Sequence, residues 1–308
     1  MSKLTELRER IRAVENIHRI TRTLATVSAA RLSRTRRRAA GMREYASRFQ
    51  AVLDRQQEYL ARVGEEIARY SDLLQPREPV RSVAIIVIAA DRGMCGGYNV
   101  EVCRLASALW SERQAAGVRV RFFAIGRKAL KYLTKRRAEI IYQRGWQRET
   151  LTALALEELL SLLLRLYRAG EIDAVDAVYT QFHSALEREP RVRRIIPVQV
   201  QAIVGETVRE APPLRWHYEP TFREIIDELV MVHLRVQLFG VLLESHASEQ
   251  GARMITMEEA SERADKALQQ YRVQHNRLRR ETITTDLLGA LYASRAIEES
   301  PADAGGGA

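Results

Sequence analysis

Apolar side chains recur at intervals of three and four over the first part of the chain, which is the spacing of one helix face. The first members of this stripe are Leu4, Leu7, Ile11, Val14, Ile17, Ile20, Leu24 and Val27. The pattern resumes at Phe49 and runs to Leu74, shortly before Pro76, which no helix continues through easily. A helix of this length would extend roughly 100 Å at about 1.5 Å per residue, which is more than a compact domain needs.

Short β-branched runs alternate with helical stretches in the middle of the chain. Strands are predicted for 82–90, 118–126, 174–182 and 193–200. Helices are predicted for 100–117, 127–138 and 152–170, with Asn99 as the N-cap of the first. Strands and helices in alternation predict a small α/β sheet that is layered by helices.

A second long helical stripe follows the α/β segment. Its apolar members are Ile225, Leu229, Val232, Val236, Phe239, Leu243, Met254, Met257, Ala264, Leu268, Tyr271 and Leu278. Methionine fills irregular gaps, so Met254 and Met257 are expected on the inward side. Neither long helix can bury its stripe alone. The predicted fold class is therefore α/β, a long antiparallel coiled coil of the N- and C-terminal helices with an inserted small, Rossmann-like α/β domain. The expected domains are 1–75, 80–205 and 220–297, with a disordered tail at 300–308.

The composition limits the classes of protein to which this chain can belong. The chain has 308 residues and a formal net charge of +10, and only five of its 49 Lys and Arg residues are lysines. A basic chain suits nucleic acid, an anionic membrane surface or an acidic protein partner. Two cysteines, Cys95 and Cys103, are too few for a disulfide framework or a four-cysteine zinc site. The longest apolar run, 83–90, is too short to span a membrane, and no signal peptide is evident, so direct membrane insertion is not expected.

The stretch "DRGMCGGYN" at 91–99 lies between a predicted strand and a predicted helix, where phosphate-binding loops occur. Its glycines do not match G-x-G-x-x-G, and no Gly-Lys-Ser/Thr ending follows. We interpret it as a tight structural turn in which Gly93, Gly96 and Gly97, beside Asp91, permit positive φ angles and close packing. A nucleotide site in an enzyme is the less favoured alternative, and no cofactor is expected.

The densest basic run consists of Arg31, Arg34, Arg36, Arg37 and Arg38. Arg31, Arg34 and Arg38 are spaced to share one side of a helix, and the other two widen that side into a band. No aromatic residue lies within the run. This favours a surface for acidic protein segments over a nucleic-acid patch.

Candidate chemistry is sparse in the rest of the sequence. The six histidines form no H-E-x-x-H motif and no i, i+4 pair on one helix, so no metal site is expected. Asp173 and Asp176 flank the start of a predicted strand and are interpreted as a loop-and-solvent pair. No pair of nucleophile and base stands out, and no catalytic residue is predicted.

Three separated stretches resemble one family, in the same order along the chain. They are "RIRAVENIHRITRTLATVSAARL" near the start, "DRGMCGGYN" after the first strand, and "SHASEQGARMITMEEASERADKAL" followed by "YRVQHNRLRRETITTDLL" near the end. Each resembles the corresponding stretch of the gamma subunits of F-type ATP synthases. The stretch from about 118 to 200 is similar to that family mainly in its pattern.

This resemblance implies a rotor shaft in the central stalk. The implied partners are the alpha, beta and epsilon subunits and the membrane c-ring, with one copy per complex and no nucleic acid. The implied role is to couple transmembrane proton or sodium flow to conformational cycling of the catalytic beta subunits, while the chain itself performs no chemistry. The implied location is peripheral, on the cytoplasmic side of the cell inner membrane.

The resemblance also assigns a partner-contact segment, with departures. Arg279, Arg280, Thr284 and Asp286 align with the family's R-Q-x-x-I-T-x-E, so that Arg280 replaces a glutamine and Asp286 a glutamate. Leu24 and Thr26 stand where the family commonly has methionines. These departures leave one alternative, the gamma subunit of a divergent ion-pumping F-ATPase. The arginine run leaves a second, an arginine-rich coiled-coil protein that binds nucleic acid.

Overall fold

The computed structural model describes residues 3–62, 67–145, 153–199 and 221–298. The chain divides into two compact units, one of Met1–Ala25 with Met257–Ala308 and one of Thr26–Thr256. The tail expected to be disordered, 300–308, lies outside the described residues. The elements, in chain order, are α1 (Lys3–Arg62), the 3-10 helix η1 (Ile67–Tyr70), β1 (Ser82–Ile88), α2 (Tyr98–Ala115), β2 (Arg119–Ile125), α3 (Arg127–Lys135), β3 (Ile140–Arg144), α4 (Ala153–Arg168), β4 (Ala174–Phe182), β5 (Arg188–Ile196) and α5 (Phe222–Glu298).

The Thr26–Thr256 unit contains a five-stranded sheet in the order β3-β2-β1-β4-β5. Strands β1 to β4 pair in parallel, and β5 is antiparallel to β4. This order and the helical crossovers confirm the Rossmann-like α/β prediction. Strand β3 was not predicted. It is a five-residue edge strand of alternating half-buried and exposed positions. Its hydrophobic pattern is too weak to predict a strand, and the strand is stabilised by its pairing with β2.

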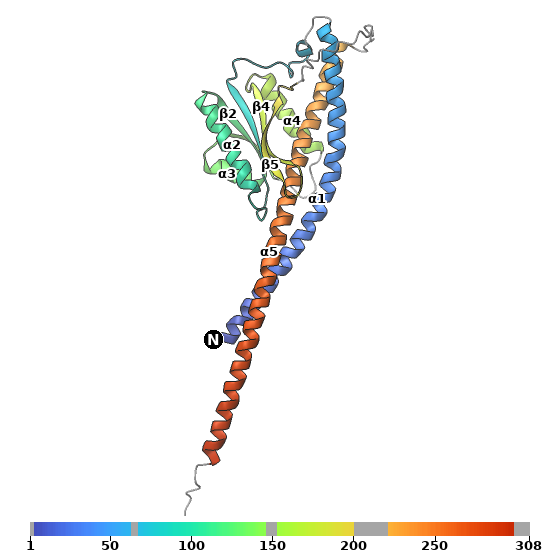
Figure 1. Ribbon diagram of the computed structural model, residues 1–308. Helices are drawn as coiled ribbons and strands as arrows, with labels where there is room; N and C mark the ends of the chain where they lie inside the picture. The colour runs from blue at the N-terminus through green and yellow to red at the C-terminus, as the bar shows by residue number, and fades with distance from the viewer. Residues whose placement is uncertain (1–2, 63–66, 146–152, 200–220, 299–308) are drawn as a thin grey trace, which may run out of the picture. The chain divides into compact units, whose positions relative to one another are not determined.

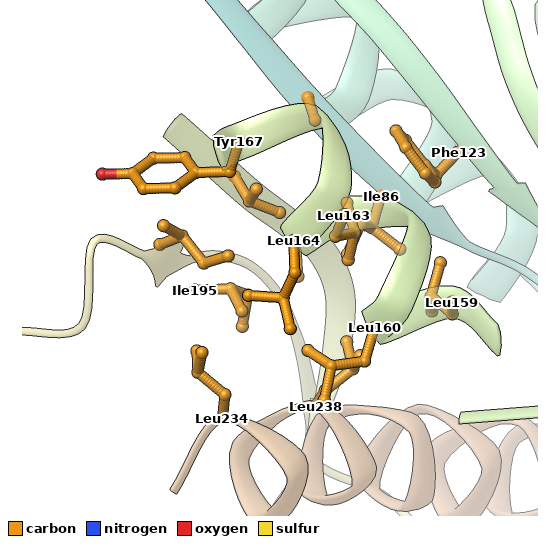
Figure 2. Close-up of a cluster of buried hydrophobic side chains, with 14 of the residues drawn as sticks. Ile86, Phe123, Leu159, Leu160, Leu163, Leu164, Tyr167, Ile195, Leu234 and Leu238 are labelled. Carbon is orange, nitrogen blue, oxygen red and sulfur yellow. The ribbon is translucent and has the colours of Figure 1, made fainter. Parts of the chain in front are cut away.

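Helices cover both faces of the sheet (Figure 1). On one face, Val83, Ile85 and Val87 pack with residues of α2 and α3. On the other, Ile86 belongs to a larger core that α4 and α5 complete. Figure 2 shows Leu238 of α5 beside α4 in this second core. Successive residues of a strand point to opposite faces, which explains why the continuous apolar run of β1 is buried throughout.

The buried stripe of α1 differs from the predicted apolar stripe. Its buried positions from Thr21 onward are mostly small or polar, and they are Thr21, Ala25, Ser28, Leu32, Thr35 and Ala39. Ile17 and Ile20 are more than half exposed, and Val27 is also exposed, so the prediction that these three face inward is wrong. Small side chains allow close approach between helices, which the hydrophobic pattern does not reveal.

The antiparallel course of the two long helices is confirmed within each unit. In the terminal unit, Arg272 donates to Glu15 at 2.9 Å and Arg8 donates to His275 at 3.3 Å. In the larger unit, Leu32 of α1 packs with Ala247 of α5, and Asp54, further along α1, lies near enough to His233, earlier on α5, to affect its pKa. From Arg279 to Arg295 every residue of α5 is exposed. In the described part of the chain, no helix is both long enough and apolar enough to cross a membrane.

Candidate functional site

The loop after β1 lies where doubly wound sheets bind ligands, outside the carboxyl end of a strand whose neighbours connect in opposite directions. In this chain α5 contacts that end of the sheet. The Tyr98 hydroxyl lies 2.7 Å from the Ser245 hydroxyl, and Ser248 donates to the carbonyl of Thr180 at 3.1 Å. Ala252 packs with Cys95 in a small buried cluster. The loop therefore packs against helix α5.

Carboxylates of the chain itself lie at the two helix N-termini that border this loop. Asp91 accepts the backbone N–H of Arg127, the first residue of α3, at 2.9 Å. At the start of α2, the Glu101 carboxylate lies so close to Gly97 that a Cβ there would clash with it. Helix N-termini attract anions, and here each already has a negative side chain next to it. This arrangement disfavours a phosphate ligand at either helix.

The three glycines of the loop meet different constraints. Gly96 has φ +56°, and a Cβ there would lie 3.1 Å from the Thr256 hydroxyl oxygen. A Cβ at Gly93 would meet nothing within 4 Å. Met94, which lies between these two glycines, also has a positive φ of 61° and is 62% exposed. Gly96 is thus the position where both backbone conformation and space require glycine.

Asn99 is not an N-cap, because α2 begins one residue earlier at Tyr98. Its side-chain oxygen accepts the N–H of Ala90 at 2.9 Å, and its amide donates to the sulfur of Cys95 at 3.0 Å. Asn99 therefore ties the end of the first strand segment to the loop. Burial is the main cause that raises the pKa of Cys95, so its thiol stays protonated at neutral pH.

A buried ion pair on α5 supports the contact between this helix and the loop at 91–99. Glu249 and Arg253 are 2.7 Å apart, and their side chains are 7% and 9% exposed. Arg253 also donates to the carbonyl of Gly93 at 3.4 Å. Burial alone would raise the pKa of Glu249, but the contacts with His246 and Arg253 outweigh it and hold that pKa below its usual value. The sequence contains a signal for this pair, a glutamate four residues before an arginine, but exposed helix faces have the same spacing.

The arginine run lies on α1 within the Thr26–Thr256 unit. Arg31, Arg34 and Arg38 are exposed, as expected for one outer side of the helix. Arg36 differs, because its guanidinium carbon lies 5.9 Å from the centre of the Phe182 ring at the end of β4. Arg36 thus brings the band into contact with the sheet domain.

The second predicted contact segment lies on α5 in the terminal unit. Arg279, Arg280, Thr284 and Asp286 are all exposed. The Thr284 hydroxyl donates to the Arg280 carbonyl at 2.9 Å, and Arg280 donates to the carbonyl of Asn276 at 3.3 Å. The two contact segments are therefore carried by different helices and different units.

Asp176 is not a solvent residue as expected. It is 2% exposed, and it forms ion pairs with Arg194 at 2.5 Å and Arg113 at 3.6 Å. Asp173 accepts the backbone N–H groups of Arg81 and Ser82, so it also has a structural role. Across the described ranges, no three His, Cys, Asp or Glu side chains gather closely enough to hold a metal ion.

Comparison with known sequences gives one consistent result. The family described as ATP synthase matches residues 3–295. The ATP synthase gamma chain of Geobacter metallireducens is 32% identical over 298 residues, which cover 97% of this chain and 100% of that protein. The gamma chain of Chlorobaculum tepidum is 31% identical over 305 residues, with the same coverage.

Comparison with solved structures agrees on the fold. The similar chains include one from the rotor of the Euglena gracilis mitochondrial ATP synthase, with a TM-score of 0.57 and 16% identity, covering 91% of this chain and 98% of that one. Another is from the central stalk and c-ring of the Tetrahymena thermophila mitochondrial ATP synthase, with a TM-score of 0.54 and 17% identity, covering 79% and 99%.

Proposed function

The chain belongs to the gamma-chain family of ATP synthases, the subunits of the central stalk, and on that premise we propose that its two long helices form the rotating shaft of the complex. Rotation of this shaft would force each catalytic beta subunit through different conformations in turn, and so couple proton or sodium flow to ATP synthesis or hydrolysis. A rotor can do this because an asymmetric shaft contacts each beta subunit differently, which gives a conformational change its differential free energy.

The main observation behind this proposal is the exposed C-terminal end of α5. Between Arg279 and Arg295 the helix has large apolar side chains that are 46–70% exposed, and these are Ile283, Leu287, Leu288, Leu291 and Tyr292. Exposed apolar side chains gathered over a few turns mark a surface for another protein. A shaft end that is enclosed by a ring of subunits would have such a surface.

The polar contacts are proposed to lie on the same helix end and on α1. Arg279, Arg280, Thr284 and Asp286 would contact a beta subunit, and Arg31, Arg34 and Arg38 would face acidic segments of the surrounding subunits. Exposed ion pairs contribute only about 0–1 kcal/mol each, so they can be exchanged between equivalent carboxylates as the shaft turns. A deep apolar interlock would instead hold one orientation.

We propose that the chain performs no chemistry itself. The occupied helix N-termini beside Asp91 and Glu101 and the helix seated at the sheet edge support this proposal. The partners would be alpha, beta and epsilon subunits and the c-ring, with one copy per complex, peripheral on the cytoplasmic side of the inner membrane. The proposed domains are 1–75, 80–205 and 220–297, which combine the two helices of the shaft with one inserted α/β domain. A nucleic-acid-binding function is not favoured by the family match.

The experiment is reconstitution of the full chain with alpha and beta subunits, followed by single-molecule rotation under ATP. We expect the chain to co-purify in one copy and to rotate, and the isolated chain to hydrolyse no ATP. Failure to join the complex, or ATP hydrolysis by the isolated chain that is lost in an Asp91→Ala variant, would contradict the proposal.

A further inference from the structure

Helix α3 has one uniformly basic side. It buries Ala129 and Leu133 against the sheet. Its exposed residues include the set that we call the α3 basic face, Arg127, Lys128, Lys131 and Lys135. At 100° per residue these four positions fall within about a quarter of the helix circumference, opposite the buried side. The helix contains no acidic residue.

Several arginines elsewhere in the α/β domain have carboxylate partners. Arg119 lies 2.8 Å from Glu139, and Arg121 lies 2.8 Å from Glu171. Among the residues that the structure describes, Lys128, Lys131 and Lys135 form no such pair. These are three of only five lysines in a chain whose other basic residues are arginines. The lysines of α3 thus differ from these paired arginines in both residue type and pairing.

The position of two of these cations works against the helix. Arg127 and Lys128 lie in the first turn of α3, where the helix dipole disfavours positive charge. The Asp91 carboxylate offsets part of this, because it accepts the Arg127 N–H and lies 3.9 Å from the Arg127 guanidinium. A local electrostatic cost that remains in a stable fold indicates a requirement outside it.

The chemistry of the face identifies its occupant. Its apolar side is already buried in the sheet, so α3 has no apolar face to insert into a lipid surface. Its one aromatic residue, Tyr132, lies under the Arg136 guanidinium at 3.7 Å and bonds to Ser107 at 2.8 Å, which leaves no ring for stacking on a base. By charge complementarity, the remaining candidate for the occupant of this face is a protein segment rich in carboxylates.

We propose that the α3 basic face is a docking surface for a carboxylate-rich segment of another subunit of the assembled complex. This surface is distinct from the arginine run of α1 and from the end of α5. It rests on the proposed function, because it needs the complex to supply the acidic segment. Its effect is electrostatic, so salt should screen it and weaken the contact.

The test uses the lysines directly, since a carbodiimide joins only an amine to a carboxyl group that touches it. The lysine nitrogen and the carboxyl carbon form an amide, and the carbodiimide takes up the lost water as a urea. The intact complex is treated at low salt, digested and sequenced by mass spectrometry. We expect amides between Lys131 or Lys135 and an acidic peptide of another subunit, reduced several-fold in about 0.5 M salt.

Matched variants separate docking from general charge. Lys131→Glu with Lys135→Glu should weaken salt-sensitive retention in the complex roughly tenfold. Lys131→Arg with Lys135→Arg should retain binding and lose only the crosslinks. The control, Arg165→Glu with Arg168→Glu, makes the same charge change at two exposed positions in the last turn of α4 and should leave retention unchanged. Circular dichroism of each variant verifies the fold.

Several outcomes would overturn the inference. These are no amide from α3 to another subunit in the intact complex, equal retention of the two charge reversals, or binding of the wild-type chain to phosphatidylglycerol vesicles or duplex DNA that Lys131→Glu with Lys135→Glu abolishes. Failure of the wild-type chain to enter the complex at all would overturn the proposed function and this inference together. Normal assembly and rotation without these crosslinks would overturn only the inference.

Discussion

Two regions of the single helix α5 reverse the usual distribution of side chains. At 245–253 it buries polar and charged groups, including Ser245, Glu249 and Arg253, against the sheet edge. At 279–295 it exposes leucines and a tyrosine. Buried polar groups need fixed partners in exact geometry, so the first region specifies one position of the helix on the α/β domain. Exposed apolar groups need only a complementary surface, so the second suits contacts that change.

The largest expected effect tests the first region. Glu249→Ala leaves the Arg253 guanidinium buried without its carboxylate, so we expect the free energy of unfolding to fall by about 3–5 kcal/mol. Urea denaturation of the isolated chain measures this. The control is Glu259→Ala, which removes an i, i+4 pair with Arg263 whose side chains are 58% and 80% exposed, and it should cost less than about 0.5 kcal/mol. Equal losses would show that the buried pair has no special role.

The next effect is a pH dependence centred on His233. Burial, the largest cause, and the nearby Arg193 lower the pKa of His233 to about 4, although Asp54 acts in the opposite direction. The unfolded chain binds this proton near pH 6.5 and the folded chain does not. Stability is therefore complete above pH 6.5 and falls as the pH drops towards 4, by about 3 kcal/mol.

A His233→Leu variant checks this assignment. It removes the titrating group and should flatten the difference in unfolding free energy between pH 7 and pH 4.5, measured by urea denaturation at each pH. If wild type and variant lose stability in parallel over that range, another group is responsible.

A third prediction separates the glycines of the loop. Gly96→Ala should destabilise the chain by about 1–2 kcal/mol, because φ is +56° and the new Cβ would press on the Thr256 hydroxyl. Gly93→Ala should change stability by less than about 0.5 kcal/mol, because its Cβ would point into open space. Thermal unfolding of the two variants, side by side, gives the comparison. A larger loss at Gly93 would contradict this assignment of constraints.

The smallest effect on stability tests the second region of α5. Leu287→Ser with Leu291→Ser should leave the unfolding free energy within about 0.5 kcal/mol per site, since both side chains are about 60% exposed. Rotation or coupled ATP synthesis in the reconstituted complex should nevertheless fall. The polar counterpart, Arg280→Ala with Asp286→Ala, should reduce ATPase rate without loss of assembly. Full activity of both variants would show that this helix end makes no functional contact.

The sequence predicted the larger elements because their patterns are long and strong. The β-branched run at 82–90 favoured a buried strand, and the two helical stripes, each too apolar to stand alone, required a partner. The three ordered stretches that resemble ATP synthase gamma subunits indicated the family, which the comparisons confirm. Weak hydrophobic patterns did not predict the elements that they belong to. Strand β3 depends on pairing with β2, and a five-residue stretch holds too little signal by itself.

Only the tertiary structure decided which polar residues are buried. Asp176 and Glu249 look like solvent residues in the sequence, and each becomes stable inside because an arginine from elsewhere in the fold or one turn away reaches it. Likewise Thr21 and Ser28 face inward on α1 while Ile17 and Ile20 face out. The sequence alone determines periodicity and local propensity. The side of a helix that is buried depends on the shape and charge of what packs there, and that information lies in residues hundreds of positions apart.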